Sequence, residues 1–279
     1  MFLVIDINSG PKEACEVKVL VFIKEVADTE ARIIISSDQK DLEIENKYTV
    51  NFFDEFAVEE AIRIKESLKD VEITVCTFAP PRAVEALRTT IAMGADRAFL
   101  IDSRNHESDD PLIVSRILAG FAVKEGFDLI LCGRQAMDDE SANVGPMIAE
   151  FLKIPHVNQV TRLQVSGNGT AEVQNEIEGG KKVSEVLLPA LLTTQKGLNE
   201  PRVPLITGVM KAMKTEIAVL DPAAIEIPFG SIDRETSKIL VLSYELPAKR
   251  PSVSIIEGAS PEEKATGLVR ALKEEAKVL

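Results

Sequence analysis

The sequence is poor in the residues that usually build aromatic or metal-binding sites. Tryptophan is absent, and tyrosine and histidine each occur only twice. So few large polar rings argue against an aromatic platform for a ligand or a groove for a carbohydrate. His106 and His156 stand in neither a His/Glu/His nor a Cys/His spacing. We therefore expect both to be solvated loop residues, and we expect no metal site.

Cysteine is also scarce, and no two cysteines form a CxxC pair. Cys15, Cys76 and Cys132 are an odd number, and the last two stand in apolar runs. This usage predicts buried, reduced thiols and a cytoplasmic location. No apolar run approaches the ~20 residues that a membrane span needs. Residues 1–16 contain Asp6 and no basic region, so we interpret them as an N-terminal extension rather than a signal peptide.

Positive charge is in deficit, since the formal net charge of the 279 residues is −13. An acidic surface repels phosphate backbones, so we expect no nucleic-acid partner. The same charge is compatible with docking to basic protein surfaces. Apolar residues make up 45% of the chain, which is enough for a sizeable core without disulfides or metal.

The familiar catalytic motifs are missing as well. There is no GxSxG elbow and no GxxxxGK[ST] loop, and no GxGxxG follows the first expected strand. We therefore predict no catalytic acid, base or nucleophile. The acidic cluster Asp138, Asp139 and Glu140 has the right ligands for Mg²⁺, but we favour a loop whose carboxylates accept hydrogen bonds from backbone N–H groups.

What is present is a regular alternation of strands and helices. Apolar runs typical of buried strands alternate with amphipathic or capped helical segments over about 140 residues, with short connections. This alternation predicts an α/β fold with a doubly wound, mostly parallel sheet. The expected strands are 17–26, 71–78, 97–101 and 128–132, and the expected helices are 55–68, 80–93, 112–125 and 141–153.

The pattern changes after residue 158. Three β-like runs with Gly-rich turns fill residues 159–194, which predicts an antiparallel hairpin added to the sheet edge. A helical VMKAMK segment follows. Residues 215–259 contain four prolines and little periodicity, and Ser260 begins a capping box for a last helix. We therefore predict an adenine-nucleotide-binding domain over 17–214 and a C-terminal arm over 215–279 that wraps a partner subunit.

The segment Asp128–Glu150 carries the strongest functional signal. It reads as a buried strand, a polar turn and a helix that Ser141 caps. The N–H groups of residues 141–145 would then form a phosphate site at the C-terminal edge of the sheet. Backbone groups of Phe22 and Cys76 would read an adenine edge. Asn51 offers an amide donor and acceptor, or alternatively a helix cap.

Six segments in the same order resemble the β subunit of electron transfer flavoprotein, from about Val17 to Lys214. They are VLVFIKEVADT, NFFDEFAVEEAIRIKE, LRTTIAMGADRAFLID, DLILCGRQAMDDESANVGPMIAEFL, EIEGGKKVSEVLLPALLTT and GLNEPRVPLITGVMKAMK. Two positions depart from the family pattern: Asn175 stands where a basic residue is usual, and Lys182 where an acid or glutamine is usual. Ile206 stands where the family usually carries a leucine that docks into a dehydrogenase.

The resemblance implies a heterodimer with an α subunit that holds a redox FAD. It implies electron transfer from dehydrogenases of the acyl-CoA dehydrogenase type, as in fatty acid oxidation, to an acceptor such as a quinone oxidoreductase. The β subunit of this family buries AMP, and electron-bifurcating relatives hold a second FAD in that place. The Val-Gly-Pro at 144–146 resembles the bifurcating type, whereas NFFDEFAVEEA and TTIAMGADRA resemble the AMP type, so we expect AMP and keep a second FAD as the alternative.

The resemblance also assigns residues. Arg134 and Gln135 would approach the partner's flavin, and Leu205, Ile206 and Lys211 would dock partner proteins, although an ordinary loop and a solvated helix face are the alternatives there. The complete predicted cofactor-binding set is Phe22, Lys24, Asn51, Cys76, Gly133, Arg134, Gln135, Asp139, Ser141, Ala142, Asn143, Val144 and Gly145.

Two other classes of protein share parts of this pattern. One is an ATP-binding protein of the universal-stress or adenine-nucleotide α hydrolase type, which usually has a Gly-rich phosphate loop ending in Gly-Ser or Gly-Thr; GRQAMDDESANVGP lacks that ending. The other is a scaffold without redox chemistry that only binds partners. ATP turnover would indicate the first, and a flavin band in a two-chain complex would exclude the second.

Overall fold

The computed structural model describes residues 17–68, 70–104, 110–249 and 252–279. The expected N-terminal extension over 1–16, with Cys15, and the expected loop around His106 lie outside these residues.

A nine-stranded sheet, ordered β11-β10-β9-β12-β8-β1-β6-β7-β13, forms the centre of the molecule. All neighbours in it are parallel except β10 with β9 and β11, so the predicted mostly parallel α/β sheet is confirmed. Its strands are β1 (Val17–Phe22), β6 (Val71–Ala79), β7 (Arg97–Asp102), β8 (Leu129–Gly133), β9 (His156–Ser166), β10 (Thr170–Ile177), β11 (Gly180–Leu187), β12 (Ala190–Thr194) and β13 (Ala218–Leu220).

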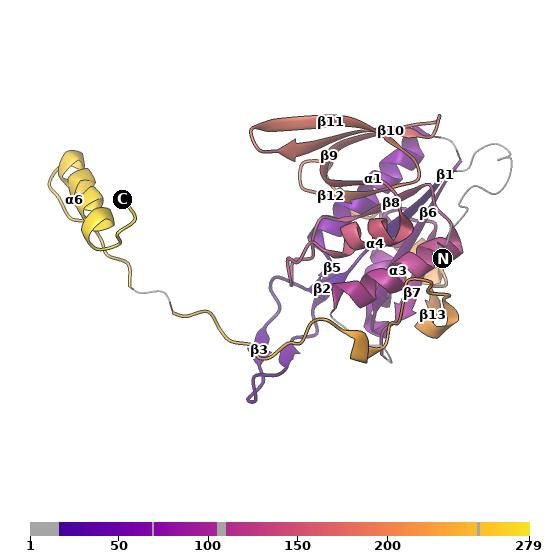
Figure 1. Ribbon diagram of the computed structural model, residues 1–279, viewed down its shortest axis with the longest axis horizontal. Coiled ribbons are helices and arrows are strands. Elements are labelled where there is room, and N and C mark those ends of the chain that lie inside the picture. The colour runs from indigo at the N-terminus through magenta and orange to yellow at the C-terminus, as the bar shows by residue number, and fades with distance from the viewer. Residues whose placement is uncertain (1–16, 69, 105–109, 250–251) are drawn as a thin grey trace.

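Helices cover both faces of this sheet (Figure 1). Alternate residues of β1 point to opposite sides: Val19 and Val21 join one buried cluster, and Leu20 and Phe22 join the other. The first cluster includes α1 and α2, and the second includes α3 and α4. The helices are α1 (Phe52–Ser67), α2 (Val84–Met93), α3 (Pro111–Glu125), α4 (Val144–Leu152), α5 (Ile206–Lys214) and α6 (Pro261–Glu274), with short 3₁₀ turns η1 (Pro81–Ala83), η2 (Pro222–Ala224) and η3 (Arg234–Thr236).

The strand expected over 17–26 is in fact two strands, so that expectation was wrong. After β1 the chain leaves the sheet, and β2 (Glu25–Ala27) pairs antiparallel with β5 (Tyr48–Val50). The break comes at Lys24, because its N–H donates to the Asp54 carboxylate at 2.7 Å instead of to a neighbouring strand. A hairpin of β3 (Ile33–Ile35) and β4 (Leu42–Ile44) fills the connection.

The last β-like run also divides. β11 ends at Leu187, and β12 lies between β8 and β9 with all five of its residues buried. The reason is that an apolar run without alternation suits a strand covered on both faces. The antiparallel β9, β10 and β11 therefore form the sheet edge as expected, but β12 belongs to the core. His156 begins β9 and is half-buried, so its expected place in a loop was wrong.

The C-terminal arm has two parts. Up to residue 238 it lies against the domain: β13 pairs with β7, Arg116 donates to the Ser231 carbonyl at 2.7 Å, and Asp110 accepts hydrogen bonds from Ser237 and Lys238. Beyond Ile239 it passes the β3–β4 hairpin, where the Tyr244 N–H donates to the Gln39 carbonyl at 2.8 Å, and then runs away from the domain and ends in α6 (Figure 1). Ser260 caps α6 as predicted, by accepting a hydrogen bond from the Glu263 N–H at 3.3 Å.

Among the described residues, no helix has both the length and the apolar character that crossing a bilayer would require.

Candidate functional site

Three parallel strands end together at the C-terminal edge of the sheet. The register places Phe22 of β1 beside Cys76 of β6 on one side and Cys132 of β8 on the other. The structure thus brings the predicted residues Phe22, Cys76 and Gly133 to one edge. The Cys76 carbonyl accepts a hydrogen bond from the Ile23 N–H at 3.1 Å, so only its second lone pair is left for a ligand.

A buried aspartate that the sequence analysis missed joins two of these strand ends. Asp54, in the first turn of α1, accepts hydrogen bonds from the Lys24 N–H and the Gly133 N–H, each at 2.7 Å. A Cβ on Gly133 would lie 2.4 Å from Asp54 Oδ1, so no larger residue fits there without a shift. The signal in the sequence was an acidic residue inside the otherwise apolar start of a helix, close after Asn51.

The environment of Asp54 changes its acidity. Burial raises its pKa to about 7, although the N–H donors of Lys24 and Gly133 favour the charged form. The pKa of the neighbouring Cys132 thiol is raised by burial and by the charge of Asp54. Burial also raises the pKa of Cys76. Both cysteines are free and buried, as predicted, and their thiols are un-ionised at neutral pH.

Asn51 holds the loop that follows β8. Its Nδ2 donates to the Gln135 carbonyl at 2.9 Å, and its Oδ1 accepts from the Met137 N–H at 3.0 Å. Asn51 occupies the N-cap position of α1, but its side chain makes no capping hydrogen bond. Asn51 and Asp54 together therefore fix the backbone from Gly133 to Met137 against the start of α1.

The acidic cluster is neutralised in part by Lys24. Its Nζ lies 2.8 Å from an oxygen of Asp138 and 3.2 Å from one of Asp139. Burial opposes the charge on Asp139, but the Ser141 N–H and Lys24 lower its pKa below the ordinary value. The predicted carboxylate-to-backbone contact is confirmed, because Asp139 accepts from the Ser141 N–H at 3.0 Å. Over the described residues, no cluster of three or more His, Cys, Asp or Glu is placed to hold a metal ion.

Helix α4 begins at Val144 rather than at Ser141, so the predicted helix start was wrong. The reason is backbone conformation: Glu140 and Ala142 have left-handed φ values of 51° and 54°. Ala142 is followed by Asn143 in the right-handed region, and the Asn143 side chain makes no capping hydrogen bond. Successive left- and right-handed residues form a nest of N–H groups that binds anions, and strained residues of this kind concentrate at functional sites.

Gly145 lets the start of α4 approach the sheet closely. A Cβ at this position would lie 2.9 Å from Thr193 Cγ2 and 3.0 Å from Cys132 Sγ. The first-turn N–H groups of α4 have no partners inside the helix and add to the nest that begins at Ala142. The backbone from Ala142 to Gly145 therefore presents a group of N–H donors of the kind that can bind an anion.

Comparison with known proteins identifies the family. The family model described as the electron transfer flavoprotein domain matches residues 42–225. The chain belongs to the electron transfer flavoprotein family. A protein of Bacillus subtilis (strain 168), named electron transfer flavoprotein subunit beta, is 36% identical over 262 residues, which cover 93% of this chain and 98% of the relative. Proteins of the same name from Syntrophomonas wolfei and Homo sapiens are 38% and 36% identical, over 94% and 84% of this chain and 98% and 91% of their own lengths.

In this family member, Arg134 is held at the end of β8. Its Nη1 donates to Gln195 Oε1 at 3.1 Å, and its guanidinium lies 4.9 Å from the ring centre of Phe53. Gln195 in turn donates to Glu176 at 3.1 Å. The backbone of Gln135 is tied to Asn51, as described above. Arg134 therefore keeps a fixed position at the rim, between the ends of β8 and β12.

The residues predicted to dock partners lie apart from this edge, at the start of α5. Leu205 precedes the helix, Ile206 begins it, and Lys211 is in its second turn; all three are exposed. The helix expected from VMKAMK is confirmed and begins three residues earlier, at Ile206.

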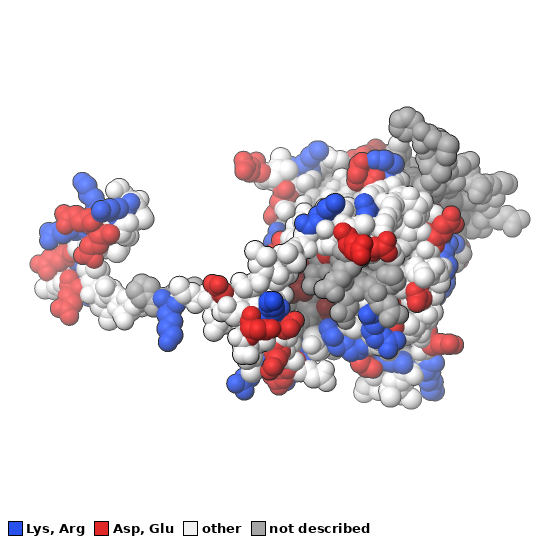
Figure 2. All heavy atoms as spheres, turned by 60° about the horizontal axis from the view of Figure 1, so that its bottom comes forward, with Lys and Arg blue, Asp and Glu red and all other residues white. Residues whose placement is uncertain are grey.

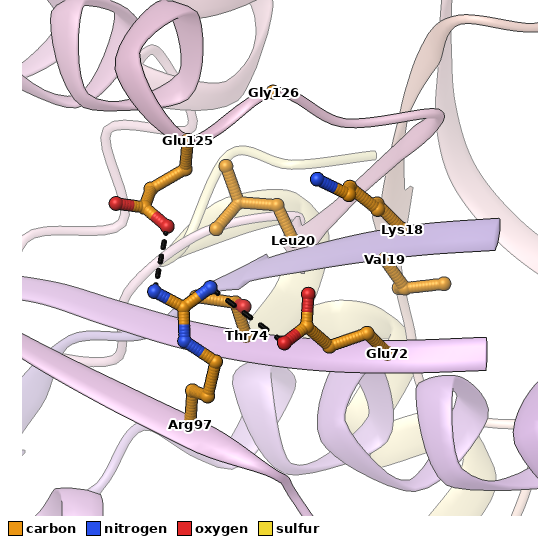
Figure 3. Close-up of a pocket in the computed structure, with 8 residues that line it drawn as sticks. All are labelled: Lys18, Val19, Leu20, Glu72, Thr74, Arg97, Glu125 and Gly126. Carbon is orange, nitrogen blue, oxygen red and sulfur yellow. Dashed lines mark hydrogen bonds and ion pairs between the residues drawn. The ribbon is translucent and has the colours of Figure 1, made fainter. Parts of the chain in front are cut away.

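The cavity in Figure 3 lies at the opposite end of the sheet and is not a nucleotide site. It holds about 10 Å³, room for one water molecule, between the first residues of β1, β6 and β7. Arg97 crosses it and pairs with Glu125 at 2.9 Å and Glu72 at 3.6 Å. The charge of Arg97 is thus paired within the chain.

Proposed function

We propose that this chain is the β subunit of a heterodimeric electron transfer flavoprotein. It pairs with an α subunit and passes electrons from dehydrogenases of the acyl-CoA dehydrogenase type, in fatty acid oxidation, to an acceptor such as a quinone oxidoreductase. The observation that carries the proposal is the strained anion nest from Ala142 to Gly145 at the C-terminal sheet edge, in a chain of this family. The cytoplasmic location stays a prediction.

The nucleotide of this proposal is AMP. Its phosphate is held by the N–H groups from Ala142 to Gly145, since the Ser141 N–H donates to Asp139. Backbone groups of Phe22 and Cys76 meet the adenine edge. The charge of the nearby carboxylates opposes phosphate binding, and Lys24 offsets it because it pairs with both Asp138 and Asp139. Asn51 contributes indirectly, by holding the loop at Gln135 and Met137.

The FAD, held mainly by the α subunit, supplies the electron-transfer chemistry when bound. This chain supplies no acid, base or nucleophile in the proposal. Arg134 offers positive charge at the rim, and it is oriented by Gln195 and Phe53. Gln135 lies beside it with its carbonyl held by Asn51. Their part is to set the charge and shape of the surface that faces the flavin.

The distal arm, residues 239–279, is proposed to cover the α subunit. It exposes large apolar side chains along its extended part, which Figure 2 shows as mostly uncharged, whereas α6 carries charges of both signs. None of the 14 residues of α6 is buried. An isolated helix of this length is marginal in water, so a partner surface has to stabilise it. The exposed apolar residues of the extended part are Ile239, Leu240, Val241, Leu242, Leu246, Val253 and Ile255.

An electron-bifurcating complex with a second FAD is the alternative, and the Val-Gly-Pro at 144–146 favours it. The AMP proposal and the bifurcating alternative are separated by releasing the cofactors from the purified two-chain complex and counting them. One FAD and one AMP per complex supports the proposal, and two FAD without AMP supports the alternative. A complex that holds neither FAD nor nucleotide, or a chain that turns over ATP by itself, overturns both.

A further inference from the structure

The segment between β12 and α5 is irregular, yet it is tied along α1. Asn199 Nδ2 donates to the Phe56 carbonyl at 3.0 Å and to Glu60 at 2.8 Å. These contacts join residues more than a hundred positions apart in the chain. The segment leads directly into Leu205 and Ile206, so whatever holds it also determines where those two side chains are displayed.

Arg202 makes the strongest of these contacts. Its guanidinium donates two hydrogen bonds to Glu59, at 2.8 and 2.9 Å, and two to Glu66, at 2.6 and 3.1 Å. The Arg202 N–H donates to Glu59 as well, at 3.1 Å. Glu59 is buried, so its charge depends on Arg202 for compensation. Paired, charge-assisted bonds of this geometry fix the direction of the segment as well as its position.

Helix α5 is fixed from the other side. A Cβ on Gly208 would lie 2.2 Å from the Ala92 carbonyl oxygen, so the α5 backbone touches the end of α2. Arg88 Nη1 donates to the Ala212 carbonyl at 2.5 Å, near the end of α5. The segment and the helix are thus held at both ends, while the side chains between them project outward: Val203, Leu205 and Ile206 are 87%, 75% and 80% exposed.

We propose that Arg202 is a positioning residue for partner docking: its clamp on Glu59 and Glu66 preorganises the segment that displays Leu205 and Ile206. The inference rests on the docking role proposed for those two residues. A preorganised apolar surface binds more tightly because the loss of chain entropy on ordering has already occurred in the free protein. Without the clamp, the segment has to be ordered when the dehydrogenase binds.

The test uses the two-chain complex with FAD bound and an acyl-CoA dehydrogenase reduced by its acyl-CoA substrate as the electron donor. Arg202→Met keeps the side-chain stem and removes the donors. We expect the apparent KM for the donor to rise about tenfold, with kcat changed less than twofold, because binding rather than electron transfer is affected. Arg202→Lys restores one charge and is expected to recover part of the loss. The matched control is Arg162→Met, an exposed arginine on β9.

A double-mutant cycle with Ile206→Ala separates positioning from a general loss of stability. If Arg202 acts by displaying Ile206, the two effects on KM are less than additive. Strict additivity, or a KM change that appears only together with loss of nucleotide, overturns the inference. So does an unchanged KM in Arg202→Met. If Arg202→Met does not fold, the cycle is run with Arg202→Lys. No effect of Ile206→Ala on the donor KM would instead overturn the docking role itself.

Discussion

Asp54 occupies the space that a side chain at Gly133 would need. The carboxylate oxygen Oδ1 accepts the Gly133 N–H at 2.7 Å, and the other oxygen accepts the Lys24 N–H at the same distance. The break after β1, the end of β8 and the start of α1 are far apart in the chain and thus meet at one carboxyl group. This part of the C-terminal sheet edge depends on the contact, since β1, β8 and α1 all end or begin there.

Gly133→Ala is expected to destabilise the chain by about 1–3 kcal/mol, the usual cost of overpacking a tight site. The added Cβ would lie 2.4 Å from Asp54 Oδ1, 2.8 Å from Phe53 Cβ and 2.9 Å from the Phe53 carbonyl carbon, and backbone cannot move as a flexible side chain does. Urea unfolding gives the free energy. The control is Gly167→Ala, where a Cβ meets nothing within 4 Å. Equal stabilities for the two variants would contradict the prediction.

Asp54→Asn tests the acidity of the buried carboxyl. Its pKa is raised to about 7 by burial, against about 3.9 for an exposed aspartate. Between these values the folded chain keeps a proton that the unfolded chain has lost. Stability therefore falls as pH rises from about 4 to 7, by at most about 1.4 kcal/mol per pH unit from this group.

Asparagine removes that dependence. The free energy of unfolding of the wild type minus that of the variant should decline between about pH 4 and pH 7, and level off above. Denaturant titrations at several pH values measure it. A difference that stays constant through this window would show that the N–H donors keep Asp54 ionised throughout.

Lys24→Gln should weaken nucleotide retention more than stability. The lysine pairs with Asp138 and Asp139, which are partly exposed, so the pairs contribute little to stability. Their uncompensated charges would, however, repel a phosphate at the nearby nest. We expect the Kd of AMP to rise about tenfold at low salt and less at high salt. Calorimetry on the two-chain complex measures the Kd of AMP. The control is Lys182→Gln, a variant on strand β11. Adding Asp138→Asn should restore binding; unaltered retention in Lys24→Gln would remove the proposed role.

Substitutions in the distal arm should weaken heterodimer assembly without destabilising this chain. Leu240 and Leu242 are 80% and 77% exposed, so their replacement by aspartate removes little packing within the chain. Loss of two leucines from an interface costs about 1.5–3 kcal/mol each, which raises the Kd for the α subunit at least a hundredfold. Leu187→Asp on the edge strand β11, 70% exposed, is the matched control. Analytical ultracentrifugation gives the Kd, and equal affinities for both variants would argue against the arm as the contact.

Local pattern was enough for much of the fold. The run Leu129–Leu131 predicted a buried strand, and Ser260 with Glu263 predicted the start of the last helix; both follow from neighbours within a few residues. Local pattern failed where tertiary contacts override it. Ser141 is a good capping residue, but its N–H donates to Asp139 and the backbone at Ala142 is left-handed. The helix therefore begins only at Val144.

Sequence alone therefore determined the α/β class, the alternation of elements and, through resemblance, the candidate residues of the rim. Only the tertiary structure decided that β12 lies between β8 and β9, that Asp54 binds Gly133, and that Arg202 holds the segment before α5 on α1. The physical reason is the separation in sequence between the residues that make each contact. Periodicity and capping depend on residues one or two turns apart, whereas these contacts join residues 79 and 143 positions apart and arise only when the sheet and its helices assemble.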